Sequence, residues 1–407
     1  MPNRFRSDAA ASTPSSEPAK VMIVDDSVVI RGLFGRWIDE DPDLTVVATH
    51  RNGQLAVDDV ERSNPDIVVL DVEMPIMDGL TALPKLLAKK RGLVVIMAST
   101  LTRRNAEVSL KALSLGATDY VAKPESTSQT STSVEFRQEL LQKLRSLGAQ
   151  VRGTSRGEPL VRARRMRAET NEGQTASSAL RHDRLDARKE MQKARSHSLV
   201  GKDGISLRSF SSAMPRVIAI GSSTGGPQAL QAMLKAAGNT LSRVPVVVTQ
   251  HMPRTFTTIL AEHIGRATGF PSKEADDGEL LKPGHIYVAP GGLHMRLAKS
   301  DGGVVAKLDD GDPINFCRPS VDPLFESVAE IYGAASLAVV LTGMGSDGAK
   351  GTERIAQKGG SVIAQDEATS VVWGMPGAAA RTGSCSAILP LDQIGPKLTR
   401  IFEGTAK

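Results

Sequence analysis

Short apolar runs rich in valine and isoleucine alternate with longer amphipathic segments along most of this 407-residue chain. Strands that alternate with helices in this way predict a parallel sheet with helices on both of its faces. The alternation spans residues 20–148 and resumes after residue 214, so we expect an α/β fold with two doubly wound parallel-sheet domains. The expected strands are 21–24, 44–48, 67–70, 93–97 and 119–121, then 217–220, 244–250, 337–342 and 361–364.

Between the two alternating regions the apolar periodicity disappears. This stretch is rich in Arg, Ser, Gly, Glu and Gln, a composition typical of a flexible linker. Inside the second region, Gly/Pro turns and short alternating runs, such as 285–288 and 295–298, predict an antiparallel hairpin. We therefore expect a disordered tail at 1–19, a first domain at 20–147, a long basic flexible linker at 148–213 and a second domain at 214–407.

The net charge of +5 is concentrated in the expected linker. Residues 148–213 contain 14 Lys and Arg against 7 Asp and Glu, a surplus larger than that of the whole chain. Aromatic residues make up only 3% of the chain, too few for a base-stacking surface. No helix-turn-helix pattern follows residue 214, which disfavours a DNA-binding regulator. We expect no nucleic-acid partner and interpret the linker as a solvated basic segment.

The chain has no segment that predicts membrane insertion or export. Its longest apolar runs have the length of strands and fall well short of the roughly 20 residues of a membrane-spanning helix. The N-terminal residues lack the apolar core of a signal peptide. The two cysteines, Cys317 and Cys385, do not form a Cys-x-x-Cys pair, so we expect neither a disulfide framework nor a zinc site. These features predict a cytoplasmic protein.

Carboxylates gather at strand ends in the first domain. Asp25 and Asp26 follow the first expected strand, and Asp71 ends the third. In a parallel sheet these ends meet at one edge, where crowded carboxylates favour a hard cation such as Mg²⁺. The cation would neutralise phosphoryl oxygens during transfer to Asp71. A single aspartate at the end of a strand is commonly a solvated loop residue. Here, however, Ser99 and Lys123 add a hydroxyl and an ammonium group at the ends of two further strands.

This set of residues resembles the receiver domain of response regulators over essentially all of residues 20–148. The resemblance implies a flavodoxin-like fold, phosphorylation of Asp71 and a bound Mg²⁺. The implied metal ligands are Asp25, Asp26, Asp71 and the backbone of Glu73. The residues implied for the conformational switch are Ser99, Tyr120 and Lys123.

A glycine-flanked serine begins the second domain. Gly221-x-Ser223-x-Gly225 lies between an expected strand and an expected helix, which is the context of a nucleophile elbow. His251 ends the next strand, 28 residues later, and Asp347 follows a third strand through a Gly-rich turn. A right-handed crossover places the ends of adjacent parallel strands side by side. The three side chains are therefore candidates for nucleophile, general base and orienting carboxylate.

Each part of this candidate site also has a simpler interpretation. The glycine loop could bind phosphate, although it lacks the Lys of a P-loop and the Gly-x-Gly-x-x-Gly spacing. His251 alone could be structural, and Asp347 alone could cap a helix. The order Ser-His-Asp disfavours the lipase fold, whose order is Ser-Asp-His. Taken together, the three groups favour a serine hydrolase, to which the turn at Met344 could supply a backbone N–H for the oxyanion.

These segments, with residues 250–253, 283–291, 318–322 and 373–376, resemble the chemotaxis protein-glutamate methylesterase family from about residue 216 to the C-terminus. The resemblance implies a Rossmann-like domain, the triad Ser223, His251 and Asp347, the Met344 backbone in the oxyanion hole, and no cofactor at the esterase site. The sequence departs from the family at two positions. Ser222 stands where the family usually has Ala, and Cys317 stands where His is commoner. The central position of the elbow favours Ser223 over Ser222 as the nucleophile.

The resemblance also implies a function in chemotaxis adaptation. The implied reactions are hydrolysis of glutamate γ-methyl esters on methyl-accepting chemoreceptors and deamidation of receptor glutamines. The implied phosphodonor is the chemotaxis histidine kinase, and the implied location is the receptor cluster at the inner membrane face. The alternative is a non-catalytic, phosphorylation-gated interaction protein of a two-component pathway. A missing triad member would favour that alternative, and all three members are present.

Overall fold

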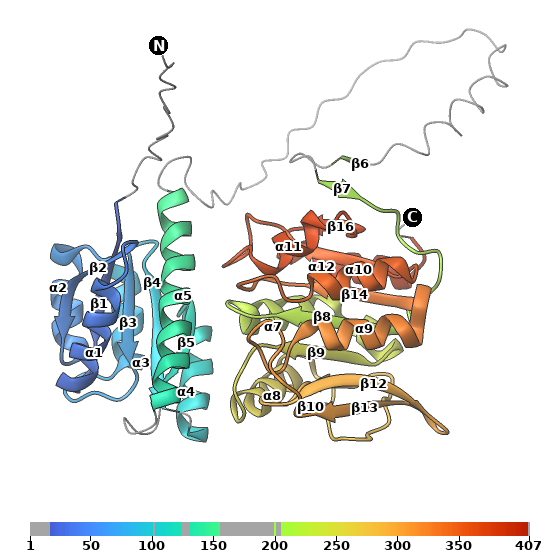
Figure 1. The fold of residues 1–407 in the computed structure, drawn as a ribbon, viewed down its shortest axis with the longest axis horizontal. Coiled ribbons are helices and arrows are strands. Elements are labelled where there is room, and N and C mark those ends of the chain that lie inside the picture. The colour runs from blue at the N-terminus through green and yellow to red at the C-terminus, as the bar shows by residue number, and fades with distance from the viewer. Residues whose placement is uncertain (1–16, 101, 124–129, 155–198, 201–204, 406–407) are drawn as a thin grey trace, which may run out of the picture. The chain divides into compact units, whose positions relative to one another are not determined.

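The computed structural model describes residues 17–100, 102–123, 130–154, 199–200 and 205–405. Within these residues the chain forms two parallel α/β folds, each described here by itself (Figure 1). Residues 1–16 of the expected disordered tail lie outside the described residues. The same holds for residues 155–198 and 201–204 of the expected linker.

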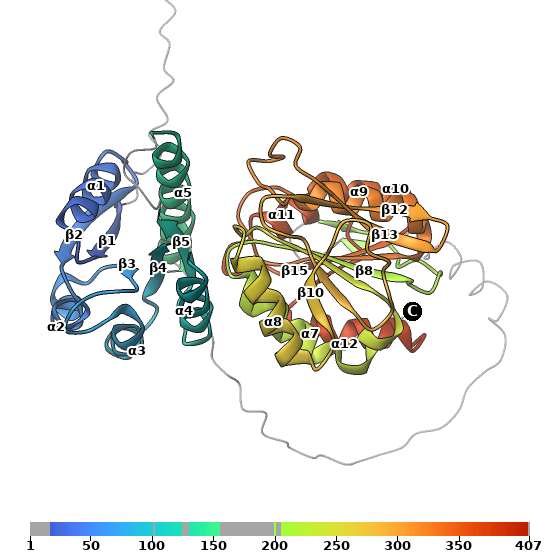
Figure 2. The ribbon, with the colours of Figure 1, turned by 90° about the horizontal axis from the view of Figure 1, so that it is seen from below.

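The N-terminal fold is a five-stranded sheet with a helix after each strand. Its elements are β1 (Ala19–Val24), α1 (Val28–Asp39), β2 (Leu44–His50), α2 (Gly53–Ser63), β3 (Ile67–Asp71), α3 (Gly79–Lys89), β4 (Val94–Thr100), α4 (Arg103–Ser114), β5 (Asp119–Lys123) and α5 (Thr130–Thr154). Helices α1 and α5 lie on one face of the sheet, and α2, α3 and α4 lie on the other (Figure 2). The five expected strands are present, and α5 continues past residue 147, the expected end of this domain.

The first four helices begin at polar side chains that satisfy free N–H groups of the first turn. Ser27, Asn52, Asp78 and Thr102 each accept a hydrogen bond from the backbone N–H three residues later. Such N-caps stabilise a helix by about 1 kcal/mol each. The caps set where each helix begins, and thereby the length of the loop that follows each of the first four strands.

The strand order is β2-β1-β3-β4-β5, so β2 lies on one side of β1 and the later strands follow on its other side. The switch point of the sheet is therefore between β1 and β3. Strand β1 pairs in parallel with both β2 and β3. Open α/β sheets bind ligands at the carboxyl ends of strands beside such a switch point. Asp25 directly follows β1 and Asp71 ends β3, so the topology places both carboxylates there.

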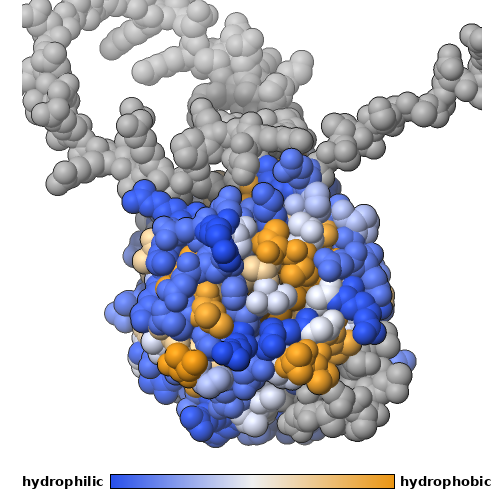
Figure 3. Space-filling view, turned by 90° about the vertical axis from the view of Figure 1, so that its left-hand side faces the viewer, coloured by the Kyte–Doolittle hydropathy of each residue, from blue (hydrophilic) through white to orange (hydrophobic). Residues whose placement is uncertain are grey.

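On the face of this fold that Figure 3 presents, the apolar residues do not form one continuous surface. Figure 3 shows separate hydrophobic patches among hydrophilic surface on the face that it presents. Val28, Val29 and Ile76 are exposed apolar residues of this fold. Scattered apolar residues of this kind are normal on a protein surface.

The C-terminal fold is larger, and its described residues form three sheets. Its elements are β6 (Leu199–Val200), β7 (Ser206–Leu207), β8 (Val217–Ser222), α7 (Gly226–Ala237), η2 (Gly238–Arg243), β9 (Val246–Gln250), α8 (Phe256–Thr268), β10 (Ser272–Glu274), β11 (Ile286–Val288), β12 (His294–Ser300), β13 (Gly303–Asp309), α9 (Val321–Tyr332), η3 (Gly333–Ala335), β14 (Ser336–Val340), α10 (Ala349–Gln357), β15 (Ser361–Gln365), α11 (Met375–Arg381), β16 (Ala387–Leu389) and α12 (Leu391–Phe402).

The main sheet of this fold is parallel throughout, with the order β10-β11-β9-β8-β14-β15-β16. Every residue of β8, β9 and β14 is buried, as expected for a parallel sheet covered on both faces. Helices α7, α8 and α12 cover one face, and α9, α10 and α11 cover the other (Figure 2). The chain passes from β8 to β9 on one side and later returns to β14 on the other. The switch point therefore lies between β8 and β14.

The predicted antiparallel hairpin is present as β12 and β13, which pair from His294 with Asp309 to Ser300 with Gly303. One part of that prediction is wrong. Residues 285–288 were expected in the hairpin, but β11 pairs in parallel with β9 and β10 in the main sheet. Strand β11 is only three residues long, and so short an alternation does not distinguish a hairpin strand from an outer strand of a parallel sheet.

Candidate active site

Ser223 lies at the turn between β8 and α7. Its backbone N–H donates to the carbonyl of Thr342 at 3.0 Å, which joins the end of β8 to the segment that follows β14. Gly225, two residues later, has a φ of 74°. A side chain there would be strained and would also meet Val371, so the glycine allows the sharp turn into α7. The Ser223 side chain is half-buried at the start of that helix.

His251 follows β9, the strand beside β8. Its backbone N–H donates to the carbonyl of Ser222 at 3.1 Å, so its main chain lies alongside the elbow. Its ring nitrogen Nε2 lies 2.7 Å from Oδ2 of Asp347. Only 11% of the His251 side chain and 2% of the Asp347 side chain are exposed. The structure therefore brings the predicted imidazole and carboxylate into direct contact at the expected sheet edge.

The Asp347 carboxylate is a buried hydrogen-bond acceptor with several donors besides His251. It accepts from the hydroxyl of Ser320 at 2.7 Å and from the backbone N–H of Val321 at 2.6 Å. Further donors are the side chain of Asn315 and the backbone N–H groups of Asp322 and Gly348. A buried charge needs such partners because burial without them costs several kcal/mol. The network holds the carboxylate ionised and fixes its direction.

The electrostatics of the site follow from this network. Burial raises the pKa of Asp347, but the hydrogen bond and charge of His251, with the donors from Val321 and Ser320, lower it well below its ordinary value. Burial lowers the pKa of His251, but the Cys317 sulfur and the Asp347 carboxylate outweigh burial and raise it to about 10. The imidazole is therefore protonated at neutral pH in this arrangement, and it must lose a proton before it can act as a base.

The two adjacent serines have different environments. The Ser222 side chain is fully buried, and its hydroxyl donates to Oε1 of Gln250 at 2.6 Å. The other end of the Gln250 amide donates to the carbonyls of Ser223 at 2.9 Å and His251 at 3.2 Å. Ser222 is thus committed to holding the elbow, whereas Ser223 is the partly exposed serine. Within the described residues, no hydrogen bond joins the Ser223 hydroxyl to His251.

The turn after β14 passes close to the elbow. A Cβ on Gly343 would lie 2.8 Å from Cβ of Ser223, so this position has no room for a side chain. Met344, the residue predicted to supply an oxyanion N–H, comes next and is half-buried. Gly343 is thus the point at which this turn comes close to Ser223, and the main chain of Met344 follows directly after it.

Two residues in contact with the candidate triad carried no role in the sequence prediction. Cys317 Sγ lies 3.3 Å from Nδ1 of His251, so both ring nitrogens have partners. The Asn315 amide donates to Oδ1 of Asp347 at 2.9 Å and to Oδ2 of Asp322 at 3.0 Å. Both belong to a turn closed by hydrogen bonds between Ile314 and Cys317. No local sequence pattern identifies these two residues, because both are distant in the chain from the residues that they contact. Cys317 lies 66 residues after His251, and Asn315 lies 32 residues before Asp347.

The acidic residues of the N-terminal fold also meet as predicted. One carboxylate oxygen from each of Asp25, Asp26 and Asp71 lies within 4.8 Å of the others. Asp25 and Asp71 are buried and Asp26 is exposed. Three carboxylates at this spacing match the oxygen ligands that hard divalent cations prefer. This cluster could therefore bind a metal ion. Glu73 lies two residues beyond β3 with an exposed side chain, outside this cluster.

The three expected switch residues lie on β4 and β5. Ser99 is buried near the end of β4, with its hydroxyl 2.8 Å from that of Ser109 on α4. Tyr120 is buried in β5, and the half-buried Lys123 ends that strand. Their strand positions are those predicted.

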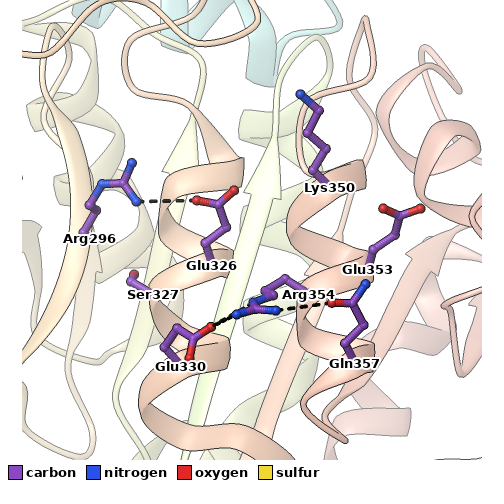
Figure 4. Close-up of a pocket in the computed structure, with 8 residues that line it drawn as sticks. All are labelled: Arg296, Glu326, Ser327, Glu330, Lys350, Glu353, Arg354 and Gln357. Carbon is purple, nitrogen blue, oxygen red and sulfur yellow. Dashed lines mark hydrogen bonds and ion pairs between the residues drawn. The ribbon is translucent and has the colours of Figure 1, made fainter.

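A pocket of about 450 Å³ lies away from the candidate triad, along α9, α10 and β12 (Figure 4). Its lining is mostly charged, and several of its side chains pair with one another. Arg354 pairs with Glu330, and Arg296 lies 3.6 Å from Glu326. This surface offers neither a nucleophile beside a base nor an apolar enclosure, so it is a weaker candidate for catalysis.

No helix within the described residues combines the length and apolar character needed to cross a membrane. Two family models match the chain in the regions of the two folds. The response regulator receiver domain matches residues 21–135, and the CheB methylesterase matches residues 218–398.

Proteins named protein-glutamate methylesterase/protein-glutamine glutaminase are similar over nearly the whole chain. The one from Rhodopseudomonas palustris (strain BisB5) is 54% identical over 395 residues, covering 97% of both chains. The one from Nitrobacter hamburgensis is 54% identical over 404 residues, covering 99% of both.

Two solved structures from Thermotoga maritima are similar to separate parts of the chain. The CheB methylesterase catalytic domain is 42% identical, with a TM-score of 0.45, and covers 46% of this chain and 100% of its own. The CheB response regulator domain is 34% identical, with a TM-score of 0.30, and covers 34% of this chain and 98% of its own.

Proposed function

The chain belongs to the CheB methylesterase family, and we propose that it hydrolyses glutamate γ-methyl esters on chemoreceptors under the control of its receiver domain. It is a carboxylic ester hydrolase that also deamidates receptor glutamines. Its relatives are named protein-glutamate methylesterase/protein-glutamine glutaminase. The alternative, a non-catalytic interaction protein, is not favoured, because relatives similar over nearly the full chain are named as enzymes.

One contact carries the proposed catalytic roles. The 2.7 Å contact between His251 Nε2 and Asp347 Oδ2 lies beside the strand end that carries Ser223. A carboxylate accepts hydrogen bonds only, so the proton of this contact resides on Nε2 and leaves Nδ1 as the basic nitrogen. Ser223 is the nucleophile, His251 the general base and Asp347 the group that orients and stabilises the imidazolium.

The reaction has two halves. The Ser223 hydroxyl attacks the ester carbonyl while Nδ1 of His251 takes its proton, and the proton then passes to the departing methanol. Backbone N–H groups of Met344 and the first turn of α7 stabilise the oxyanion. Water, deprotonated by His251, then cleaves the acyl-enzyme and releases glutamate. From a glutamine, the same steps release ammonia. No cofactor takes part at this site.

The receiver site would hold Mg²⁺ through the carboxylates of Asp25, Asp26 and Asp71 and the backbone of Glu73. When bound, the cation supplies positive charge that offsets the phosphoryl oxygens. Asp71 is the phosphoacceptor. Once Asp71 is phosphorylated, Ser99 and Lys123 hold its phosphoryl group. The aromatic side chain of Tyr120 then changes its orientation. Because the Ser99 hydroxyl pairs with Ser109, the switch would exchange that hydrogen bond for one to the phosphoryl group.

The proposed organisation has a tail at 1–19, a receiver domain at 20–147, a basic linker at 148–213 and a catalytic domain at 214–407. The substrates are methyl-accepting chemoreceptors, and the phosphodonor is the chemotaxis histidine kinase. No nucleic acid is involved. Because the substrate side chains lie on the cytoplasmic part of receptors, the enzyme acts in the cytoplasm at receptor clusters on the inner membrane face.

Methanol release from methylated receptor, with and without a small-molecule phosphodonor, tests the proposal. The wild type should release methanol, and the phosphodonor should accelerate it. Ser223→Ala should abolish release, whereas Ser222→Ala should retain it. Asp71→Asn should hydrolyse esters without responding to the phosphodonor. Release by Ser223→Ala near the wild-type rate would refute the nucleophile assignment, and a normal phosphodonor response of Asp71→Asn would refute the switch.

A further inference from the structure

The turn Ile314–Cys317 places a thiol against the general base of the proposed reaction. Cys317 Sγ lies 3.3 Å from Nδ1 of His251, the nitrogen that must accept the Ser223 proton. Asp347 occupies the opposite nitrogen. The described structure thus pairs the basic nitrogen with Cys317 and not with the serine.

The thiol is held in this position by its surroundings. Backbone hydrogen bonds in both directions join Ile314 and Cys317, and both residues between them have positive φ, 53° at Asn315 and 62° at Phe316. The Asn315 amide then ties this two-residue turn to the carboxylates of Asp322 and Asp347. Cys317 is therefore fixed beside the imidazole by the same buried network that orients the triad carboxylate.

A thiol beside an imidazole is chemically activated. The imidazole can take the thiol proton and leave a thiolate–imidazolium pair, and the thiolate is the nucleophilic form of cysteine. The titratable groups that contact the His251 ring are Cys317 and Asp347, with Asp322 beyond them across Asn315.

The second cysteine provides a natural internal control. The chain has two cysteines in all, and both are free thiols. Cys385 is fully buried, and burial raises the pKa of its thiol to about 12. Cys317 is partly exposed. Thiol chemistry on the folded protein should therefore report on Cys317 alone.

We propose that Cys317 is a reactive thiol whose oxidation by hydrogen peroxide switches the esterase site off. This inference rests on the proposed function of Ser223 and His251. The Cys317 thiolate attacks one oxygen of the peroxide, an S–O bond forms as the O–O bond breaks, and the hydroxide that leaves takes the proton of the imidazolium to become water. Sulfur is oxidised to a sulfenic acid and the peroxide is reduced. The added oxygen stands next to Nδ1 and bars it from Ser223, and a thiol reductant restores the site.

The test uses the full-length chain in four forms: wild type, Cys317→Ser, Cys385→Ala and Ser223→Ala. Each active form is treated with hydrogen peroxide, and its ester hydrolysis is compared with its own untreated rate, before and after dithiothreitol. Wild type and Cys385→Ala should lose most of their activity and recover it with the reductant. Cys317→Ser should keep its own rate. Equal inactivation of Cys317→Ser and wild type would overturn the proposal.

A labelling experiment decides the question even if Cys317→Ser proves inactive. A sulfenic-acid probe followed by peptide mass spectrometry should find Cys317 modified in wild type, Cys385→Ala and Ser223→Ala. In Cys385→Ala, adding His251→Gln should slow alkylation of Cys317 by iodoacetamide about tenfold at neutral pH, because the thiolate loses its proton acceptor. Absence of the Cys317 adduct, or an unchanged alkylation rate, would overturn the proposal. Ser223→Ala separates the two hypotheses, because it should take the label but release no methanol.

Discussion

The imidazole of His251 donates through Nε2 to Oδ2 of Asp347 at 2.7 Å, although the two residues are 96 positions apart in the chain. The contact forms because β9 and β14 flank β8 in the same parallel sheet, so the segments that follow these strands converge at one edge. Asp347 keeps its charge there through hydrogen bonds from Ser320 and Val321. The fold thus assembles an oriented imidazole beside the elbow serine before any substrate binds.

Asp347→Asn should keep the shape of this site and remove its charge. The amide would present an N–H or a neutral oxygen to His251. The imidazolium would then lose the stabilising negative charge, and the tautomer of the neutral ring would no longer be fixed. We expect kcat/KM for ester hydrolysis to fall by on the order of 10³ to 10⁴, the scale of such replacements in serine triads. Methanol release and a thermal unfolding curve should be measured together. A correctly folded variant within tenfold of wild-type activity would show that Asp347 does not support the base.

The pH dependence of hydrolysis should report the protonation of His251. Burial lowers the pKa of this imidazole, but Cys317 and Asp347 raise it to about 10. Only the unprotonated ring can accept the serine proton, so kcat/KM should rise with pH up through this pKa.

Cys317→Ala should shift that profile. It removes one of the causes that raise the pKa of His251, so the acid limb of kcat/KM should move to lower pH. Cys385→Ala is the matched control and should leave the limb where it is. Superimposable profiles for wild type and Cys317→Ala would contradict an electrostatic coupling between the thiol and the imidazole.

Gln250 should matter more for the elbow than Ser222 does. Ser222→Ala removes one hydroxyl and leaves Oε1 of Gln250 without its donor, which should cost about 1–3 kcal/mol in the free energy of unfolding. Gln250→Ala also frees the carbonyls of Ser223 and His251. We expect it to lower both stability and kcat, while Ser222→Ala lowers stability and leaves most of kcat. Denaturant titrations and methanol release check this order, which would be wrong if Ser222→Ala were the less active variant.

The acidic cluster should bind Mg²⁺ through its three carboxylates. Asp71→Asn or Asp26→Asn removes a charged ligand, and we expect the dissociation constant for Mg²⁺ to rise at least about tenfold in calorimetric titration. Asp58→Asn is the matched control, because Asp58 lies on α2 with an exposed hydrogen bond to Gln54 and takes no part in the cluster. Equal affinities for all four proteins would place the cation elsewhere.

Much of the architecture could be predicted from local patterns. The central strands β8, β9, β14 and β15 are continuous apolar runs, and their alternation with helices predicts a parallel sheet. The outer strands β10, β11 and β16 have three residues each, too few for a period to be recognised. This is why the sequence wrongly predicts a hairpin strand at 285–288 and predicts neither β10 nor β16.

Local sequence patterns were enough to identify the chemical groups at the strand ends: Asp25 and Asp71 in one sheet, Ser223, His251 and Asp347 in the other. They were enough because strand ends and their polar residues are local features, and because parallel topology brings them to one edge. The contacts of each group, in contrast, depend on how the whole fold packs. Packing buried Ser222 against Gln250, turned Nε2 of His251 to Asp347, and brought Cys317 to Nδ1. Those contacts join residues between 28 and 96 positions apart, and such separations are set by how helices and loops pack and not by any repeating pattern in the chain.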